Sequence, residues 1–221
     1  MVAVAVSVAA ARLEDGDMGI IKQTDLDAVS AAIKKAELHT DAELVAVLAR
    51  RADDYRYIPT LWAALIGLVS PSLVLVSGLW LTTTEILMTQ ATVFVVLALV
   101  LRIPMIMYRL IPRSVRQWRA QNLARRQFLE NNLHHTAGES GVLIFVSEAE
   151  RYVEIIADRG IDQHVSPEHW QDIVDNLTAA IKQGETTRGL TDSIAACGKI
   201  LAAHVPATSE KNELPNHLIV L

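Results

Sequence analysis

The sequence has little cysteine, and this scarcity limits the kinds of site that it can build. Cys197 is the one cysteine, so no disulfide can form within the chain, which suits a reducing compartment. We expect this thiol to lie on an apolar helical face as part of the core. The seven histidines show no spacing typical of zinc ligands. No phosphate-binding loop, dinucleotide fingerprint or nucleophile elbow is present, and the commonest nucleotide-binding and hydrolase motifs are therefore excluded.

Acidic side chains are absent from two long apolar runs in the middle of the chain. Ile58–Trp80 carries no charge, and Ile86–Met107 carries only Arg102. A helix of about 20 apolar residues crosses the ~30 Å hydrocarbon core of a bilayer. The short link Leu81–Glu85 makes the two runs antiparallel, so the sequence predicts a transmembrane hairpin over residues 57–108. The alternative is the buried hairpin of a soluble core, which would need a much larger protein to cover it.

Basic residues gather outside the apolar runs, while the link between them has one acid and no base. All charged side chains from Arg102 to Arg126 are arginines. The positive-inside rule therefore places both chain ends in the cytoplasm, with the hairpin in the plasma (inner) membrane of a bacterium. The net charge of −5 gives no sign of bulk nucleic-acid binding, although a nucleic-acid or protein surface is the alternative use of this basic segment. We expect four of its arginines to contact anionic lipid headgroups: Arg109, Arg113, Arg116 and Arg119.

The segments on either side of the apolar runs show the periodicity of an α/β fold. Three strands are expected at Glu43–Ala49, Gly141–Val146 and Tyr152–Asp158. Helices are expected over residues 24–40, 114–133, 167–183 and about 187–204. In the second of these helices, Trp118, Leu123 and Phe128 are expected to point inward. The pattern predicts a small mixed sheet with helices on both faces, an α/β/α sandwich.

The first helix and strand precede the hairpin and cannot form a core alone. They must pair with elements that follow the hairpin, so the hairpin is interpreted as an insertion into one split cytosolic domain. The first twenty-three residues are expected to be disordered, and the tail is expected to be a loop with a short apolar end. The predicted divisions are 1–23, 24–56, 57–108, 109–206 and 207–221.

Several of these segments resemble the TPM domain family in their order and spacing. Thr40–Leu48 is similar to the family's first strand, and His135–Val146 to the threonine-and-glycine lead into its central strand. Glu150–Asp162 is similar to the second strand with its glycine-containing turn, and Gly184–Leu190 to the start of the last helix. The sequence most resembles a bacterial membrane subgroup in which a transmembrane pair interrupts the domain and the chain ends in Asn-Glu-Leu-Pro-Asn, here Asn212–Asn216.

The resemblance implies an α/β/α sandwich and two kinds of activity. Some family members bind divalent metal and a few are credited with weak acid-phosphatase activity, whereas others assist the assembly or repair of membrane complexes. This sequence departs from the family in two respects. Its arginines place the domain inside the cell, whereas family members usually lie in a lumen, the periplasm or the extracellular space. The turn that is commonly Gly-x-Gly-Leu-Glu reads Asp-Arg-Gly-Ile-Asp over Asp158–Asp162 and lacks the first glycine.

Two carboxylates are the main candidates for chemistry. Asp158 and Asp162 lie at the carboxyl end of a predicted strand and in the turn beyond it, where ligands often bind in open α/β sheets. With backbone carbonyls they could hold Ca²⁺ or Mg²⁺ through oxygen. Arg159 would engage a phosphate or neutralise the two acids, and Glu43 would join them only if its strand end lies beside the turn. The alternative is an ordinary solvated turn.

These observations lead to one main functional hypothesis and two alternatives. The main hypothesis is an integral membrane protein whose cytosolic domain is a binding, assembly or quality-control module, with lipids and other membrane proteins as partners. The first alternative is a divalent-metal-dependent phosphatase of low efficiency. The second is a purely structural membrane protein that has no specific partner.

The predicted topology can be tested directly. A reporter that is active only in the cytoplasm should be active when fused after Leu221, because the arginines flank both outer ends of the apolar runs. A reporter that is active only outside the membrane should be silent at the same position. Activity of the external reporter alone would reverse the topology.

Overall fold

The computed structural model describes residues 3–7, 23–78, 80–136, 138–208 and 218–221. The chain divides into two compact units. The globular unit consists of Met1–Ala52 and Gln117–Leu221, and the helical unit consists of Asp53–Arg116. The helical unit is therefore an insertion in the sequence of the globular unit.

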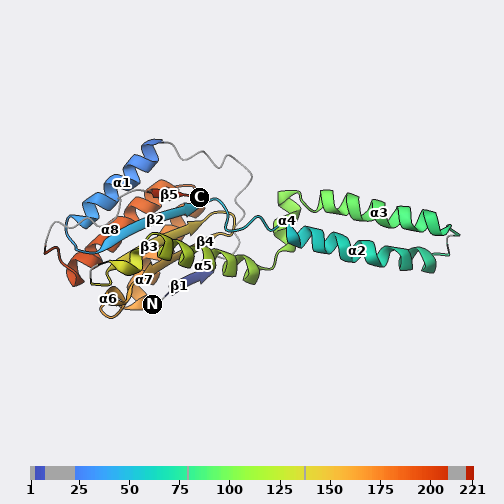
Figure 1. Ribbon diagram of the computed structural model, residues 1–221. Coiled ribbons are helices and arrows are strands. Elements are labelled where there is room, and N and C mark those ends of the chain that lie inside the picture. The colour runs from blue at the N-terminus through green and yellow to red at the C-terminus, as the bar shows by residue number, and fades with distance from the viewer. Residues whose placement is uncertain (1–2, 8–22, 79, 137, 209–217) are drawn as a thin grey trace. The chain divides into compact units, whose positions relative to one another are not determined.

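A mixed sheet of five strands forms the centre of the globular unit, in the order β1-β4-β3-β2-β5 (Figure 1). β2 runs parallel to β3 and β5, whereas β4 runs antiparallel to β3 and β1. Two neighbouring parallel strands need a crossover connection, and the connection from β2 to β3 contains the whole helical unit. The strands are β1 Ala3–Ser7, β2 Glu43–Ala49, β3 Gly141–Ser147, β4 Tyr152–Ala157 and β5 Leu218–Val220.

Helices cover both faces of this sheet, as the periodicity predicted (Figure 1). Side chains alternate along each strand, so that Leu44 and Ala46 face one core while Val45 and Val47 face the other. The first core is closed by helices α1, α6, α7 and α8, and the second by α5 and the short 3-10 helix η1. The helices are α1 Gln23–Glu37, α5 Arg113–Glu130, η1 Leu133–His135, α6 Arg159–Asp162, α7 Pro167–Lys182 and α8 Thr186–His204.

The face that α5 presents to the sheet differs from the predicted one. Trp118 was expected to point inward, but 55% of it is exposed, and its ring lies 5.0 Å from the guanidinium carbon of Arg119. Ala120 and Ala124 are instead completely buried, with Phe128 on the same face as predicted. Trp118 precedes Ala120 by two positions, which is more than half a helical turn, so the two cannot share a face. Leu123 is partly buried.

The ends of the chain contain strands that the sequence did not indicate. Ala3–Ser7, expected to be disordered, form β1 and pair with β4. Leu218–Val220, expected to belong to a loop, form β5 and pair with β2. Each strand covers an edge of the three-strand centre, where unpaired backbone groups are available. The motif Asn212–Asn216 lies outside the described residues, as do residues 8–22.

The helical unit contains α2 Tyr57–Val76, α3 Thr83–Val100 and α4 Pro104–Leu110. By length and composition α2 and α3 are each able to cross a membrane. The second apolar run extends to Met107, but it is divided between two helices: α3 ends at Val100, and Pro104 lies in the first turn of α4. Glu85 belongs to α3 and not to the link, because it forms a capping box with Thr82.

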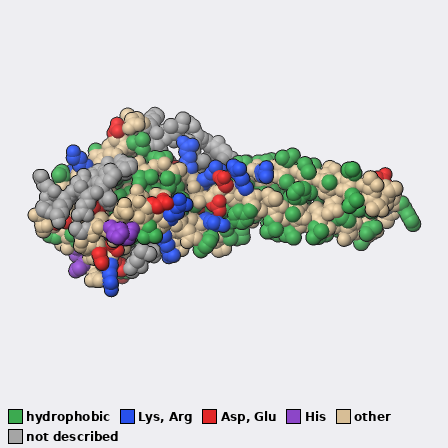
Figure 2. Space-filling view, in the orientation of Figure 1, with side chains coloured by type: hydrophobic (Ala, Val, Ile, Leu, Met, Phe, Trp, Pro, Cys, Tyr) green, Lys and Arg blue, Asp and Glu red, His purple; other side chains and the backbone are tan. Residues whose placement is uncertain are grey.

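α2 and α3 pack against each other through small residues. Ala63, Gly67 and Ser70 are buried on one face of α2, and a Cβ atom on Gly67 would lie 3.3 Å from Cβ of Phe94 on α3. Close packing through small side chains is typical of helices in membranes. Many large apolar side chains are exposed on the rest of this helical hairpin (Figure 2). Its exposed large side chains include Leu61, Leu65, Leu68, Leu73, Val76, Leu87, Met88 and Leu99.

Candidate functional site

The candidate carboxylates lie at the edge of the sheet where β2 and β3 begin and β4 ends. Gly141 is the central residue of this edge. Its carbonyl accepts a hydrogen bond of 2.8 Å from the backbone N–H of Asp158, and it pairs in register with Glu43. Glu43, Gly141 and Asp158 therefore form one row across three neighbouring strands.

This row brings Glu43 to the edge that holds Asp158 but not beside it. One strand separates the two residues, which corresponds to about 10 Å between their Cα atoms at the usual strand spacing. The prediction of a ligand site at this edge rested on the rule that ligands in open α/β sheets bind at the carboxyl ends of parallel strands. β4 is antiparallel to β3, so the edge is the carboxyl end of β4 but the amino end of β2 and β3. The rule therefore applies to one strand only.

Asp158 has both a structural role and an unused oxygen. It precedes α6, and its Oδ1 accepts a hydrogen bond of 2.8 Å from the backbone N–H of Arg159. Its Oδ2 is buried and has no hydrogen-bond partner among the residues that the structure describes. The backbone N–H of Asp162 donates to the carbonyl of Asp158, and Arg159 is exposed. The two aspartates thus share one turn with Arg159, whose side chain is exposed.

The threonine-and-glycine lead into β3 packs against this turn. Thr136 Oγ1 accepts a hydrogen bond of 3.0 Å from the backbone N–H of Ser140. A Cβ atom on Gly160 would lie 2.1 Å from the carbonyl oxygen of Gly138, and one on Gly141 would lie 2.2 Å from that of Leu133. Both glycines are therefore required for the backbones to approach so closely.

The described residues do not form a closed metal site. No three His, Cys, Asp or Glu side chains in the described part of the chain are placed to share a metal ion. Asp158 and Asp162 could contribute carboxylate oxygens, but a cation such as Mg²⁺ would need its other ligands from backbone carbonyls, water or a substrate. A Ca²⁺ or Mg²⁺ ion bound at this turn would therefore occupy an open site that is partly filled by water.

Glu37 is a member of this edge that the sequence did not indicate. Its Oε1 accepts a hydrogen bond of 3.0 Å from the backbone N–H of Leu44, next to Glu43. Burial raises the pKa of the Glu37 carboxyl to about 7; the charge of Glu43 raises it further, and the hydrogen bond from Leu44 opposes the shift. A glutamate at the end of an amphipathic helix gives no sequence signal of burial, because charged residues are common at that position.

The four arginines expected to meet lipid lie on two consecutive helices. Arg109 is in α4, and Arg113, Arg116 and Arg119 follow in α5 at three-residue spacing. Residues three apart lie on neighbouring parts of one helical surface. The three arginines of α5 therefore share a side of that helix.

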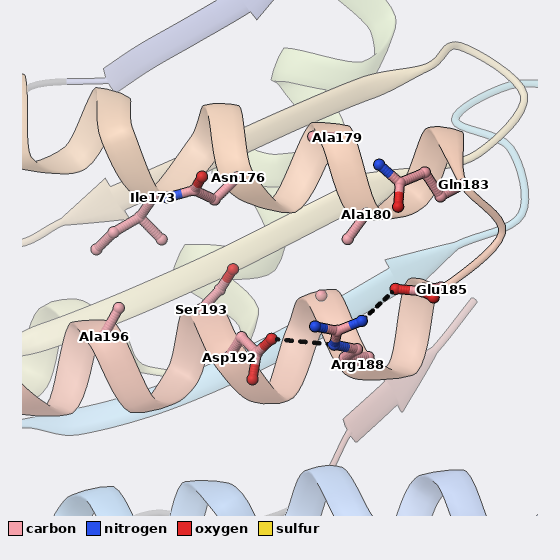
Figure 3. Close-up of a pocket in the computed structure, with 11 residues that line it drawn as sticks. Ile173, Asn176, Ala179, Ala180, Gln183, Glu185, Arg188, Asp192, Ser193 and Ala196 are labelled. Carbon is pink, nitrogen blue, oxygen red and sulfur yellow. Dashed lines mark hydrogen bonds and ion pairs between the residues drawn. The ribbon is translucent and has the colours of Figure 1, made fainter.

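A separate hollow lies between α7 and α8 in the globular unit (Figure 3). Its volume is about 360 Å³. The helices approach closely beneath it, because a Cβ atom on Gly189 would lie 2.8 Å from that of Ala180. Arg188 lies on its wall and forms ion pairs of 2.8 Å with Glu185 and 3.7 Å with Asp192. These two acids neutralise the arginine, so the described residues that line the hollow offer no free positive charge to hold an anion.

Comparison with known proteins finds a family model and a solved structure that match this chain. The family model described as the TPM domain matches residues 107–200, which include β3, β4 and α7. The chain is also similar in fold to the NMR structure of BA42 protein from the psychrophilic bacterium Bizionia argentinensis. That match has 19% identity and a TM-score of 0.59, and covers 94% of this chain and 100% of the other. No curated protein matches the chain.

Replacing Glu37 should change the pH dependence of stability. The carboxyl has a pKa of about 7 when folded and about 4.5 in the unfolded chain, so folding is penalised increasingly as the pH rises from about 4.5 to 7. Glu37→Gln removes this penalty and keeps the acceptor for Leu44. Because the side chain is partly solvated, we expect the variant to gain about 1–2 kcal/mol more at pH 8 than at pH 5.

Denaturant unfolding at the two pH values measures this difference. Asp27→Asn, an exposed change on the same helix, is the control and should show no such dependence. An equal effect of Glu37→Gln at both pH values would contradict the assignment.

Proposed function

From the premise that this chain carries a TPM domain, we propose that it is an integral membrane protein whose globular unit binds and assembles other membrane components. The proposal places the helical hairpin of α2 and α3 across the plasma (inner) membrane of a bacterium and both chain ends in the cytoplasm. The partners are lipids and other membrane proteins.

The observation that carries this proposal is the exposed apolar surface of the hairpin. A soluble protein rarely exposes large contiguous apolar patches, whereas a membrane requires them. None of α3 is buried, and the large side chains along both helices face outward. The helices satisfy their own backbone hydrogen bonds, as segments in lipid must. On α2 the buried positions Ala63, Gly67 and Ser70 are small, while large apolar side chains of the hairpin are exposed to the surrounding solvent or lipid.

The arginines support the orientation. Arg50, Arg51 and Arg56 precede α2, and α4 and α5 contribute the basic residues that follow α3. Each basic side chain near an anionic membrane surface contributes about 1 kcal/mol of attraction. Arg113, Arg116 and Arg119 would act additively because they share one side of α5.

A binding role fits the chemistry of the globular unit better than efficient catalysis. Among the described residues its edge offers Asp158 and Asp162 in one turn, with Glu43 a strand away and no nucleophile beside a base. Catalysis by nucleophile and base needs these groups within hydrogen-bond reach. A module that holds membrane proteins together needs only a stable binding surface.

Photo-crosslinking in intact cells tests the binding role. A crosslinking amino acid placed at exposed Trp118 on α5 should capture another membrane protein, and capture should fall at least threefold in an Arg113→Gln, Arg116→Gln variant. The same probe at exposed Ala195 on α8 is the control for a different surface. Recovery of lipid alone at every probed position, or release of the whole chain by alkaline carbonate, would contradict the proposal.

The second candidate function is a divalent-metal-dependent phosphatase of low efficiency. The buried Oδ2 of Asp158 favours it, because a buried carboxylate oxygen without a hydrogen bond is a ready ligand for a cation. In this reaction Asp158 and Asp162 would hold Ca²⁺ or Mg²⁺, and Arg159 would engage the phosphate. Glu43 would act only through water, since a strand separates it from Asp158.

The purified full chain in detergent tests this second function. Mg²⁺ or Ca²⁺ should raise the melting temperature and support hydrolysis of a simple phosphate monoester, and Asp158→Asn with Asp162→Asn should remove both effects. Asp172→Asn, exposed on α7, should leave both unchanged. Metal-independent hydrolysis, or activity retained in the double variant, would remove these residues from the reaction.

A further inference from the structure

Glu154 occupies an unusual place for an acid, the middle of the buried strand β4. None of its surface is exposed. Tyr152 and Ile156, two residues before and after it, belong to the core beneath α5, so alternation directs Glu154 to the same face. Neither carboxyl oxygen has a hydrogen bond of normal geometry to any residue that the structure describes. A charged carboxylate in this environment is strongly disfavoured unless a cation reaches it.

The groups around Glu154 are one cation and two uncharged polar side chains. On β4 the nearest titratable side chain is Tyr152, which is almost completely buried. The residue opposite on β3 is Phe145, and the residue opposite on β1 is Ala5. From α5, Gln121 and Arg125 act on the carboxyl. Burial raises the pKa of Glu154 to about 7, while Tyr152, Arg125 and Gln121 oppose the shift.

Arg125 is exposed although it lies within electrostatic reach of a buried acid. This arrangement suits a neutral Glu154, which needs no counterion. An ionised Glu154 would favour a different arrangement, in which the guanidinium of Arg125 or water approaches the carboxylate. Ala120 and Ala124 pack α5 tightly against the sheet, so neither can enter without a displacement of α5.

We propose that Glu154 and Arg125 form a proton-controlled latch between β4 and α5. While Glu154 is neutral, α5 packs closely on the sheet. When Glu154 ionises, α5 loosens and allows Arg125 and water to reach the carboxylate. The event is a transfer of one proton from the Glu154 carboxyl to solvent, and it needs no other reactant. It is independent of the metal and of the edge that contains Asp158.

The latch gives the α5 segment a sensitivity to pH in the range near neutrality. α5 follows the helical hairpin in sequence after the short helix α4, and it carries three of the four arginines considered above. A protein that binds other components through α5 would therefore bind differently above and below pH 7. This consequence concerns the helix itself, so it can be measured without knowledge of any partner.

Hydrogen exchange of the full chain in detergent tests the latch. Backbone amides of residues 117–130 should exchange about tenfold faster at pH 8 than at pH 6, after correction for the intrinsic chemical rate. This tenfold factor is what linkage predicts if the pKa of the Glu154 carboxyl is about 7 in the closed form and about 4.5 in the open form. The increase in exchange should level off above pH 8. Glu154→Gln should make exchange in α5 independent of pH.

Two further variants separate the latch from a general effect of pH. Arg125→Gln removes the nearby cation, so the increase in exchange should persist but shift to higher pH. Glu168→Gln, an exposed change on α7 across the sheet, should behave as the unaltered protein does. Amides of β3 should show no comparable change in any of these proteins.

A direct titration keeps the proposal testable if Glu154→Gln does not fold. Besides the signal of Glu37, the carboxyl signals of isotopically labelled glutamate should include one that titrates between pH 6 and 8 in the unaltered chain and at higher pH in Arg125→Gln. Titration of every glutamate other than Glu37 below pH 5.5 would overturn the proposal. So would a pH-dependent exchange of α5 that survives in Glu154→Gln.

Discussion

The structure of the globular unit depends on the pairing of β2 with β3. The two strands are parallel, they are in register from Glu43 opposite Gly141 to Ala49 opposite Ser147, and every residue of both is buried. The whole helical unit, α5 and η1 lie between them in sequence. The entropic cost of closing a loop, as a free energy, grows only with the logarithm of the loop length, by about 0.6 kcal/mol per doubling. An insertion of this size is therefore compatible with a stable sheet, provided that the pairing buries enough apolar surface.

This pairing also explains which parts of the fold the sequence could predict. The runs that form β2, β3 and β4 are apolar and short, and their own composition is sufficient to indicate buried strands. β1 and β5 are strands only because an edge of the sheet is available to them, and that edge is made by residues far away in the sequence. The exposed position of Trp118 has a similar origin. The hydrophobicity of Trp118 suggested that it would be buried. A helix can turn only one of its faces to the sheet, however, and in α5 the alanines occupy that face.

The candidate site was predictable to a similar degree. Asp158 and Asp162 could be assigned to the end of a strand, because a strand followed by a polar turn is a local pattern. Their relation to Glu43 could not be assigned, since it depends on the direction of β4 relative to β2. Glu37 and Glu154 were missed for different reasons. Glu37 is at a helix end, where acids are ordinary, whereas Glu154 lies in an otherwise apolar strand and could have been recognised as a polar residue at a buried position.

Glu154 and the helical hairpin present the same physical problem in opposite forms. The hairpin exposes apolar surface that water disfavours, and Glu154 buries a carboxyl that an apolar core disfavours. The stability of the folded chain alone explains neither feature. An ordinary soluble α/β protein would be more stable with polar side chains on the hairpin surface and with a leucine in place of Glu154. In the proposed setting, lipid would resolve the first conflict and a bound proton would resolve the second. The two features meet in sequence at α5, which is where a change in the charge of Glu154 would have its largest mechanical effect.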